Sequence, residues 1–317
     1  MKRHILIAAV GSINADLIAY KSMVSQRANY AYGSHFELAL GGKSLNVALT
    51  ASTFSEDVAL IARVGNDIFG LEILDRLMRR GLITQYITID ENAHTGVGHV
   101  RVDEQGQYDT IVVNGANWNL DESDLDKFLA DGYVPKYVVF NFETDLHLLK
   151  KVIPKFRDLG SRIVINFSPI VNDMRDLLSL ADVAVLNLEE AQQILNTGAD
   201  NPRVLLDKLK TLGPDIVVIT QGADGAAALN SDGALIQVAA QSATVKNTVG
   251  AGDGFLASLV YSIATGIDIE QSMINATHVG KIICSKKEAS LDKEDVLILN
   301  SEPTFVQSVN NSVSAKG

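Results

Sequence analysis

An eight-residue stretch from Asn247 to Gly254, with the sequence NTVGAGDG, constrains how this chain can fold more than any other feature. A strand-like apolar run, Ala234 to Val238, precedes it. Apolar residues at helical spacing follow it and end at Gly266: Phe255, Leu256, Leu259, Val260 and Ile263. Small residues therefore occupy the point where a loop enters a helix. Free backbone N–H groups and the positive helix end favour an anion there, above all a phosphate.

Asp253 lies at the same point, where a carboxylate would otherwise repel a phosphate. One interpretation is that Asp253 takes a proton from a hydroxyl while the loop amides hold a phosphoryl group in transfer. The other is an ordinary glycine-rich turn in which Asp253 caps the helix. The stretch alone does not separate the two.

Two better-known phosphate motifs are excluded by single positions. Gly250-Ala251-Gly252 starts like GxGxxG, but Phe255 stands at the sixth position. Gly42-Lys43-Ser44 ends like a P-loop, but Glu37 stands where its first glycine is required. Neither a Rossmann dinucleotide site nor a Walker NTPase is predicted.

Composition limits the class of protein and its partners. At 317 residues and 47% hydrophobic content, the chain can form one or two domains with a large core. Its net charge of −11 makes nucleic acid and anionic membranes poor partners. The single cysteine, Cys284, excludes an intrachain disulfide and a multi-cysteine zinc site. No apolar run approaches the ~18–20 residues of a membrane span, so the cytoplasm is the expected location.

Strand-like and helix-like segments alternate along most of the chain, which predicts a parallel sheet with helices on both faces. The expected strands are His4–Val10, Val58–Val64, Tyr137–Asn141, Arg162–Asn166, Val183–Leu186 and Asp215–Thr220. The expected helices are 44–51, Phe69–Arg80, 145–158, 171–180, 189–197, 202–212 and Ile269–Lys286.

Two β-rich pieces, about 14–40 and 90–115, interrupt this alternation. We expect them to form one small sheet beside the main layers, as a candidate lid. Residues 1–300 are predicted to form a single domain, and the polar tail 301–317 is expected to fray.

Polar residues recur where the expected strands end, which is where α/β proteins bind ligands. Asn14 and Asp16 alternate with apolar residues and can point the same way, although an Asx turn explains them equally simply. Lys43 and Asn46 share a face of the helix that Gly41-Gly42 opens, although Ser44 could simply be its N-cap. Further strand ends carry Glu143, Asn166, Asn187 with Glu190, and the run Thr220 to Gly225.

Together these pieces resemble a ribokinase-type sugar kinase of the PfkB family, over nearly the whole chain from Gly11 to Ala289. Gly41-Gly42-Lys43 with Asn46 resembles the N-terminal signature of that family, and Thr248 to Asp253 resembles its C-terminal signature. The resemblance implies a three-layer αβα fold with a mostly parallel central sheet and a small β-sheet lid. It also implies transfer of the γ-phosphoryl group of ATP to a primary hydroxyl of a small sugar, with D-ribose the leading candidate.

The resemblance assigns catalysis and sugar binding to particular residues. Asp253 would be the catalytic base, and the amides of Gly250, Ala251 and Gly252 would form the anion hole. The residues implied to bind sugar hydroxyls are Asn14, Asp16, Gly42, Lys43, Asn46 and Glu143.

The nucleotide side is implied in the same way. Asn187 and Glu190 match a motif that places Mg²⁺ through water, an arrangement that suits an ion preferring oxygen ligands. The residues implied to contact ATP are Asn187, Thr220, Gly222 and Gly225, with Asn275 and Thr277 near the adenine.

The chain departs from ribokinases at three places. Asn247, beside Val249, stands where they usually carry an aspartate that helps bind an activating monovalent cation, and Glu288 replaces a usual glycine. We expect a K⁺ site that is weakened, or rebuilt with Glu288. Residues 25–30 lack the usual Pro-x-x-Gly-Glu turn, which leaves ribose itself open, and Trp118 is expected to pack in the lid or to stack on a substrate ring.

Several alternatives remain at this stage. A kinase of the same fold could act on deoxyribose, a ketohexose or a nucleoside, although Asn14, Asp16 and Glu143 favour a small free sugar. A sugar-binding regulator without catalysis is a different class, against which the retained Asp253 and Glu190 argue. We also predict a homodimer that pairs through the lid.

Overall fold

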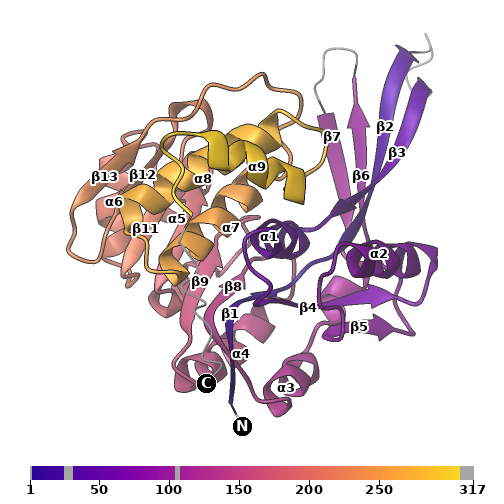
Figure 1. Ribbon diagram of the computed structural model, residues 1–317, viewed down its shortest axis with the longest axis horizontal. Helices are drawn as coiled ribbons and strands as arrows, with labels where there is room; N and C mark the ends of the chain where they lie inside the picture. Colours follow the sequence, from indigo (N-terminus) through magenta and orange to yellow (C-terminus); the bar gives the residue numbers. More distant parts are fainter. Residues whose placement is uncertain (1, 25–30, 104–107, 308–317) are drawn as a thin grey trace, which may run out of the picture.

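The computed structural model describes residues 2–24, 31–103 and 108–307. Within these residues the chain forms three layers, with a large sheet between two layers of helices and a smaller sheet to one side (Figure 1). This arrangement confirms the predicted three-layer fold with a mostly parallel central sheet.

The central sheet has the strand order β13-β12-β11-β10-β9-β8-β1-β4-β5. Neighbours are parallel from β5 to β11, while β12 and β13 join as an antiparallel edge. The strands are β1 (Arg3–Val10), β4 (Val58–Gly65), β5 (Ile87–Asp90), β8 (Tyr133–Phe140), β9 (Arg162–Asn166), β10 (Val183–Asn187), β11 (Ile216–Thr220), β12 (Ala226–Leu229) and β13 (Leu235–Val238).

Helices bury their apolar faces in two separate cores, one on each face of this sheet. One face carries α1 (Lys43–Ser52), α2 (Ile68–Arg79), α7 (Ala251–Ala264), α8 (Ile269–Cys284) and α9 (Lys293–Ser301). The other carries α3 (Glu122–Ala130), α4 (Leu146–Asp158), α5 (Leu188–Leu195) and α6 (Pro202–Lys210). None of the helices in the described part of the chain is long and apolar enough to cross a lipid bilayer.

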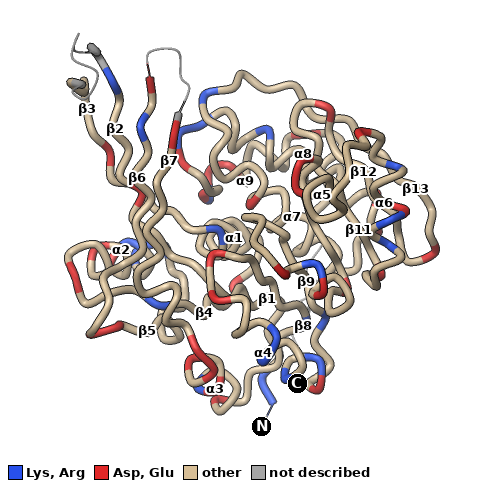
Figure 2. The backbone as a smooth tube through the Cα atoms, turned by 180° about the vertical axis from the view of Figure 1, so that it is seen from behind, with Lys and Arg blue, Asp and Glu red and all other residues tan. Residues whose placement is uncertain are grey.

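The smaller sheet is the predicted lid. Its strand order is β3-β2-β6-β7, from β2 (Asn14–Val24), β3 (Ala31–Gly41), β6 (Gly96–Val102) and β7 (Tyr108–Val113). Seen from behind, these strands rise away from the main layers at the edge next to α2 (Figure 2). The lid begins directly after β1 and returns directly to α1, so its root lies at the carboxyl end of a central strand.

Some expected elements differ from those observed. Residues 171–180 contain a short 3-10 helix, η2 (Arg175–Leu180), in place of an α-helix. The segment after Lys286 forms an additional helix, α9. The expectation that the tail frays from Ser301 is wrong for residues 302–307, because both main-chain polar groups of Val306 bind the Asn275 side chain and Glu302 pairs with Lys281.

Candidate active site

A cavity of about 400 Å³ opens between the lid and the carboxyl edge of the central sheet. Its size is in the range of small-molecule sites. The structure brings together these residues predicted from sequence: Asn14, Asp16, Gly42, Lys43, Asn46, Glu143, Asn187, Val249, Gly250, Gly252 and Asp253. The segments that carry them are far apart in the chain, so their convergence supports the prediction of one site.

The N-terminus of α7 forms the floor of this cavity. Gly250 caps the helix with φ 79°, a left-handed conformation that disfavours a side chain. A Cβ atom there would also overlap the backbone oxygen of Ala289. The loop is therefore held against the segment after α8, and Gly250 and Gly252 bring the N-terminal end of α7 to the cavity as a candidate anion site. The Ala251 N–H, predicted to belong to this site, donates instead to the carbonyl oxygen of Thr248.

Asp253 is buried at this helix end, with 6% of its surface exposed. Burial raises the pKa of its carboxyl above the ordinary value, and the charges of Glu143 and Glu190 add to this. Lys43 and a 2.8 Å hydrogen bond from Asn46 Nδ2 act in the opposite direction. A carboxyl with a raised pKa is a better proton acceptor near neutral pH, as a general base requires.

Asn46 connects Asp253 to the ligand-accessible cavity. Its Nδ2 group donates to Asp253, while its buried Oδ1 atom has no hydrogen-bond partner among the described residues. A buried acceptor without a partner is costly. A ligand hydroxyl that donates to this oxygen would remove the cost.

Two more carboxylates face the same space. The pKa of Asp16 is raised to about 7, by burial first and then by the charges of Glu143 and Asp253. Glu143 Oε2 accepts from the Lys43 N–H at 3.1 Å and from the Ser12 hydroxyl. Ser12 is fully buried, and no local pattern in the sequence indicated this role for it.

The lid supplies the remaining wall of the cavity. The sequence alone did not indicate which lid residues would line it. Gly98, Val100, Thr110 and Val112 line the cavity from β6 and β7. A Cβ atom on Gly98 would overlap the Asp16 carboxylate, so the strand can approach Asp16 closely only with glycine here. An ion pair between Glu37 Oε1 and Lys287 Nζ (2.8 Å) joins the lid to the segment that supports Gly250.

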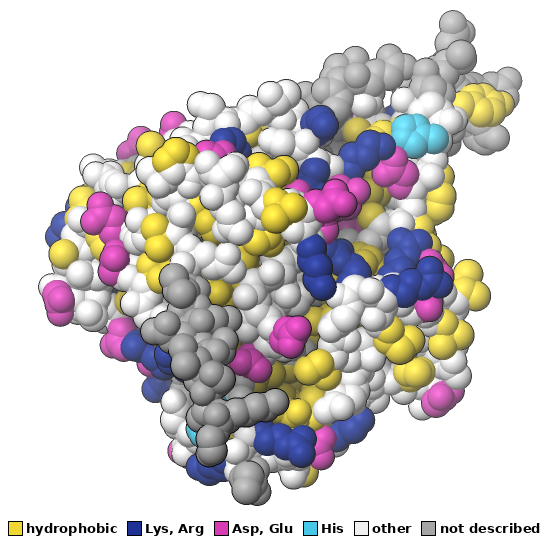
Figure 3. All heavy atoms as spheres, in the orientation of Figure 1, with side chains coloured by type: hydrophobic (Ala, Val, Ile, Leu, Met, Phe, Trp, Pro, Cys, Tyr) yellow, Lys and Arg dark blue, Asp and Glu magenta, His cyan; other side chains and the backbone are white. Residues whose placement is uncertain are grey.

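Positive charge gathers near the junction of lid and main layers, against the overall charge of −11 (Figure 3). Lys43 lines the cavity itself, and Lys286 and Lys287 lie on the segment after α8. Lys286 pairs with Asp295 and Lys287 with Glu37, so of these three cations it is Lys43 that faces the cavity, where it can help an acidic protein to hold an anion.

Four of the predicted nucleotide residues follow strands β10 and β11 along the sheet edge beside this cavity: Asn187, Thr220, Gly222 and Gly225. Asn187 and Glu190 form a reciprocal capping box at the start of α5, with bonds of 2.8 and 2.7 Å. The register of β10 and β11 places Thr220 opposite Asn187. Gly222 and Gly225 follow Thr220 with φ of 57° and 98°, so this loop turns sharply back over the sheet edge.

The residues present fit a magnesium site built partly by substrate. Among residues 2–24, 31–103 and 108–307, no three acidic, histidine or cysteine side chains converge as a ready-made metal site. Mg²⁺ commonly uses one or two carboxylates together with phosphates and water. Glu190 lies near enough to raise the pKa of Asp253, which is consistent with that role.

Three predicted residues lie elsewhere. The side chain of Asn275 binds both main-chain groups of Val306, so a nucleotide could reach it only by displacing that segment. Thr277 is buried and donates to the carbonyl oxygen of Ile274 within α8. Trp118 is 60% exposed and does not line the cavity, while the departure at residues 25–30 lies outside the described residues.

The predicted monovalent cation site contains a hydrogen-bond donor. Asn247 Nδ2 donates to the carbonyl oxygen of Lys287 at 3.0 Å, and its Oδ1 accepts from the Val249 N–H. An N–H donor cannot ligate a cation. Glu288 is exposed. These residues therefore do not fit a cation site built around the Asn247 side chain.

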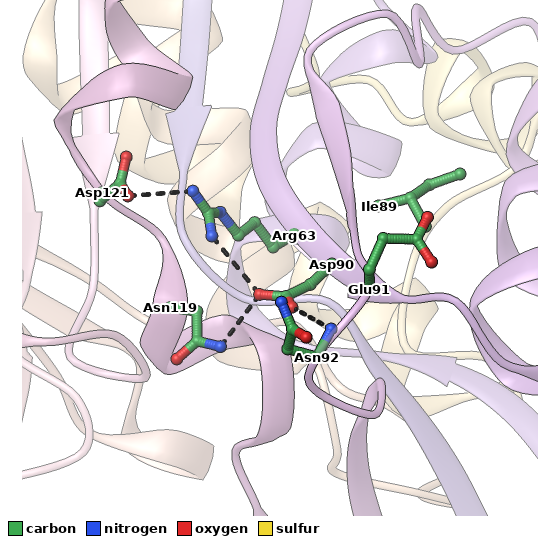
Figure 4. A pocket seen from close by; sticks show the side chains of 7 residues that line it. All are labelled: Arg63, Ile89, Asp90, Glu91, Asn92, Asn119 and Asp121. Carbon is green, nitrogen blue, oxygen red and sulfur yellow. Dashed lines mark hydrogen bonds and ion pairs between the residues drawn. The ribbon is translucent and has the colours of Figure 1, made fainter.

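A second hollow lies near the root of the lid and is lined by an ion-pair network (Figure 4). Arg63 at its centre pairs with Asp90, Asp121 and Asp124, at 3.4, 3.1 and 2.7 Å. A hydrogen bond from Asn119 also helps to hold the pKa of Asp90 below its usual range. Because Arg63 and the neighbouring Asn119 and Thr88 supply hydrogen bonds to the buried carboxylates, we interpret the network as structural.

Replacement of Arg63 by methionine is expected to lower the free energy of unfolding by about 3 kcal/mol, because Asp90 and Asp124 would remain buried without a cation. Urea denaturation would measure the change. The matched control is Arg79→Met, which removes the exposed pair with Asp75 and should cost less than about 0.5 kcal/mol. A loss for Arg63→Met as small as that of the control would contradict a structural role for the network.

Comparison with known proteins identifies the family. Residues 4–295 match the family model described as pfkB family carbohydrate kinase. The chain belongs to the pfkB family of carbohydrate kinases. The match includes both the loop at Gly250 and the residues that carry the lid.

Individual relatives of this pfkB family member are distant. It is 27% identical to a ribokinase of Schizosaccharomyces pombe over 90% of this chain and 93% of that protein. It is 25% identical to a deoxyribokinase of Salmonella typhi, over 85% of this chain and 89% of that protein. A solved structure of Arabidopsis thaliana ribokinase, complexed with ribose and ATP, superposes with a TM-score of 0.84 at 22% identity, over 95% of this chain and 100% of that one. Family membership makes the protein a carbohydrate kinase, and these identities leave the acceptor open.

Proposed function

We propose that this protein transfers the γ-phosphoryl group of ATP to a primary hydroxyl of a small free sugar, with D-ribose the leading candidate. The observation that carries the proposal is the buried Asp253, a carboxyl of raised pKa at the anion-binding end of α7, facing a cavity with two further carboxylates. A neutral polyol offers only hydroxyls, which carboxylates and amides can orient.

Each residue has a defined part in the reaction. Asn14, Asp16, Asn46 and Glu143 hold the sugar so that one hydroxyl points at Asp253. Asp253 accepts the hydroxyl proton, and the N–H groups at the start of α7 stabilise charge on the phosphoryl group in flight. Catalysis of phosphoryl transfer consists mainly of such positioning and charge stabilisation.

ATP binding at the edge beyond Asn187 is supported by the continuity of the site along the sheet. The loop Thr220–Gly225 borders that edge. Glu190, with Asn187, would hold Mg²⁺ through water, and the ion would neutralise the phosphates.

The lid argues for a free sugar over a nucleoside. Strands β6 and β7 of the lid line the cavity with one glycine, two valines and a threonine, and none of the described lid residues that line it has an aromatic ring to stack on a base. Deoxyribose is the closest competitor, since both ribokinases and a deoxyribokinase are relatives.

The test is ADP release from Mg-ATP with D-ribose, 2-deoxy-D-ribose, D-fructose and adenosine, in separate reactions. Turnover with ribose well above the other acceptors would support the proposal. Turnover mainly with another acceptor would identify that compound, and not ribose, as the preferred substrate. Calorimetric binding of a sugar without turnover of any would instead identify a non-catalytic sugar-binding regulator.

Replacement of Asp16 by asparagine is expected to weaken sugar binding and to stabilise the protein at high pH. The folded pKa, about 7, is above the ordinary 3.8, so this group contributes stability below pH 4 that is lost as pH rises through 7. Asparagine does not ionise, so the free energy of unfolding of the variant should exceed that of wild type by about 2 kcal/mol more at pH 8.5 than at pH 5.5. Thermal unfolding at both pH values would show it, and an equal gain at both would contradict the assignment.

Weak dependence on K⁺ is expected, because the Asn247 side chain is engaged with Lys287 and Val249. Activity should differ little between potassium and tetramethylammonium salts. Asn247→Asp should increase the dependence several-fold by restoring a carboxylate. If the wild-type enzyme were strongly potassium-dependent and Glu288→Gly left that unchanged, a site rebuilt with Glu288 would be wrong.

Two expectations from the sequence stay predictions. Pairing of two copies through the lid is consistent with exposed apolar side chains on its strands, including Tyr32, Phe36 and Ile111. The cytoplasmic location also stays a prediction.

A further inference from the structure

A pair of buried asparagines lies at the root of the lid, beside the cavity. Asn117, in η1 (Gly115–Asn119), has 1% of its surface exposed, and Asn14 at the start of β2 has 4%. The N–H of Ile13 donates to Asn117 Oδ1 at 2.9 Å. Asn117 Nδ2 in turn donates to Asn14 Oδ1 at 2.7 Å.

The main chain determines the orientation of both side-chain amides. A backbone N–H can only donate, so Asn117 must present its oxygen to Ile13. The NH₂ group of Asn117 then donates to Asn14, whose side-chain oxygen must accept this hydrogen bond. The Nδ2 group of Asn14 is then on the other side, and Asn14 lines the cavity.

The lid leaves no room for another arrangement. Gly96, the first residue of β6, pairs in register with Asn14. A Cβ atom on Gly96 would overlap both Asn117 Nδ2 and Asn14 Oδ1. The turn that carries Asn117 is itself held, since the Ala116 N–H donates to the carbonyl oxygen of His94 at 2.8 Å.

We propose that Asn117 is a positioning residue that sets the acceptor specificity of this kinase, by forcing Asn14 to present a hydrogen-bond donor to the substrate. This inference rests on the proposed sugar-kinase function. The same cavity is lined by the carboxyl groups of Asp16, Glu143 and Asp253, which accept when ionised, and also by the side chains of Lys43 and Asn46. A hydroxyl that accepts from Asn14 and donates to a carboxylate satisfies both, whereas a deoxy position satisfies neither.

The test is Asn117→Asp, which keeps the size of the side chain and its acceptor for Ile13. The variant is assayed at a pH at which the new carboxyl is ionised, because its protonated form could still donate to Asn14. In the ionised form its second oxygen faces Asn14, so Asn14 must turn and present an oxygen to the cavity. We expect KM for D-ribose to rise about tenfold to a hundredfold, the effect of one mismatched buried hydrogen bond. The kcat at saturating sugar and the KM for ATP should change by less than threefold.

Ligands that lack single hydroxyls separate this role from a structural one. Calorimetry would compare D-ribose, 2-deoxy-D-ribose and 3-deoxy-D-ribose on wild type and variant. The deoxy sugar that binds worst to wild type should lose much less affinity than ribose does in Asn117→Asp, because that sugar already lacks the hydroxyl that contacts Asn14. Equal weakening of all three sugars would overturn the proposal and indicate a structural role.

Two further variants keep the result decisive. Gly96→Ala puts a methyl group on the same amide pair and should reproduce the selective loss if Asn117→Asp does not fold. Asn119→Ala loosens the same turn through Asp90 and should bind all three sugars as wild type does. If wild type binds ribose and Asn117→Asp binds it equally well, this inference alone is wrong. If wild type neither binds nor phosphorylates any sugar, the proposed function is wrong as well.

Discussion

Asp253→Asn is expected to lower kcat by about 10³- to 10⁴-fold, within the range of general-base catalysis. Asparagine keeps the shape of the side chain and can still bond Asn46, but it cannot accept the hydroxyl proton. Steady-state kinetics with the best acceptor would measure the loss, and calorimetry would show sugar affinity within a few-fold of wild type.

The fold should survive this replacement. Burial already disfavours the charged carboxyl of Asp253, so the free energy of unfolding should be unchanged or higher. Asp268→Asn is the matched control, since Asp268 caps α8 and asparagine is an equally good N-cap. Retention of more than a tenth of wild-type kcat in Asp253→Asn would exclude Asp253 as the base.

Gly250→Ala is expected to lower kcat by about 10²- to 10³-fold, comparable to loss of a preorganised donor that stabilises transition-state charge. Alanine disfavours the φ of 79°, and its methyl group would overlap the backbone of Ala289. The loop must then move, and the N–H groups at the start of α7 no longer converge on the phosphoryl position. Sugar binding, which depends on other segments, should change much less.

Gly266→Ala is the control at the opposite end of α7. Gly266 also has a left-handed φ, 91°, but a Cβ atom there meets nothing within 4 Å. This variant should show the cost of backbone strain alone, about 1 kcal/mol of stability, with normal kcat. Equal kinetic loss in both variants would attribute the effect to α7 stability and not to the anion site.

Much of the fold could be predicted because its signals are local. Buried parallel strands read as short apolar runs, and glycine or polar residues mark their ends, so β1, β9 and β10 were located within a residue or two. The elements that were missed have weak local signals. Helix α3 and the short strand β12 each carry little distinctive periodicity, and η2 has apolar spacing that a 3-10 helix shares with an α-helix.

The sequence by itself determined the glycine-rich entry into a helix at Gly250, the acid at Asp253 and the polar residues that follow successive strands. Each depends on residues adjacent in the chain, where backbone geometry alone fixes their relation. Only the tertiary structure decided what those groups do to one another. The hydrogen bond from Asn46 to Asp253, the support of Glu143 by Ser12 and the orientation of Asn14 by Asn117 join residues 103 to 207 positions apart. Such contacts depend on how the sheet, the helices and the lid pack together, and no local pattern encodes that packing.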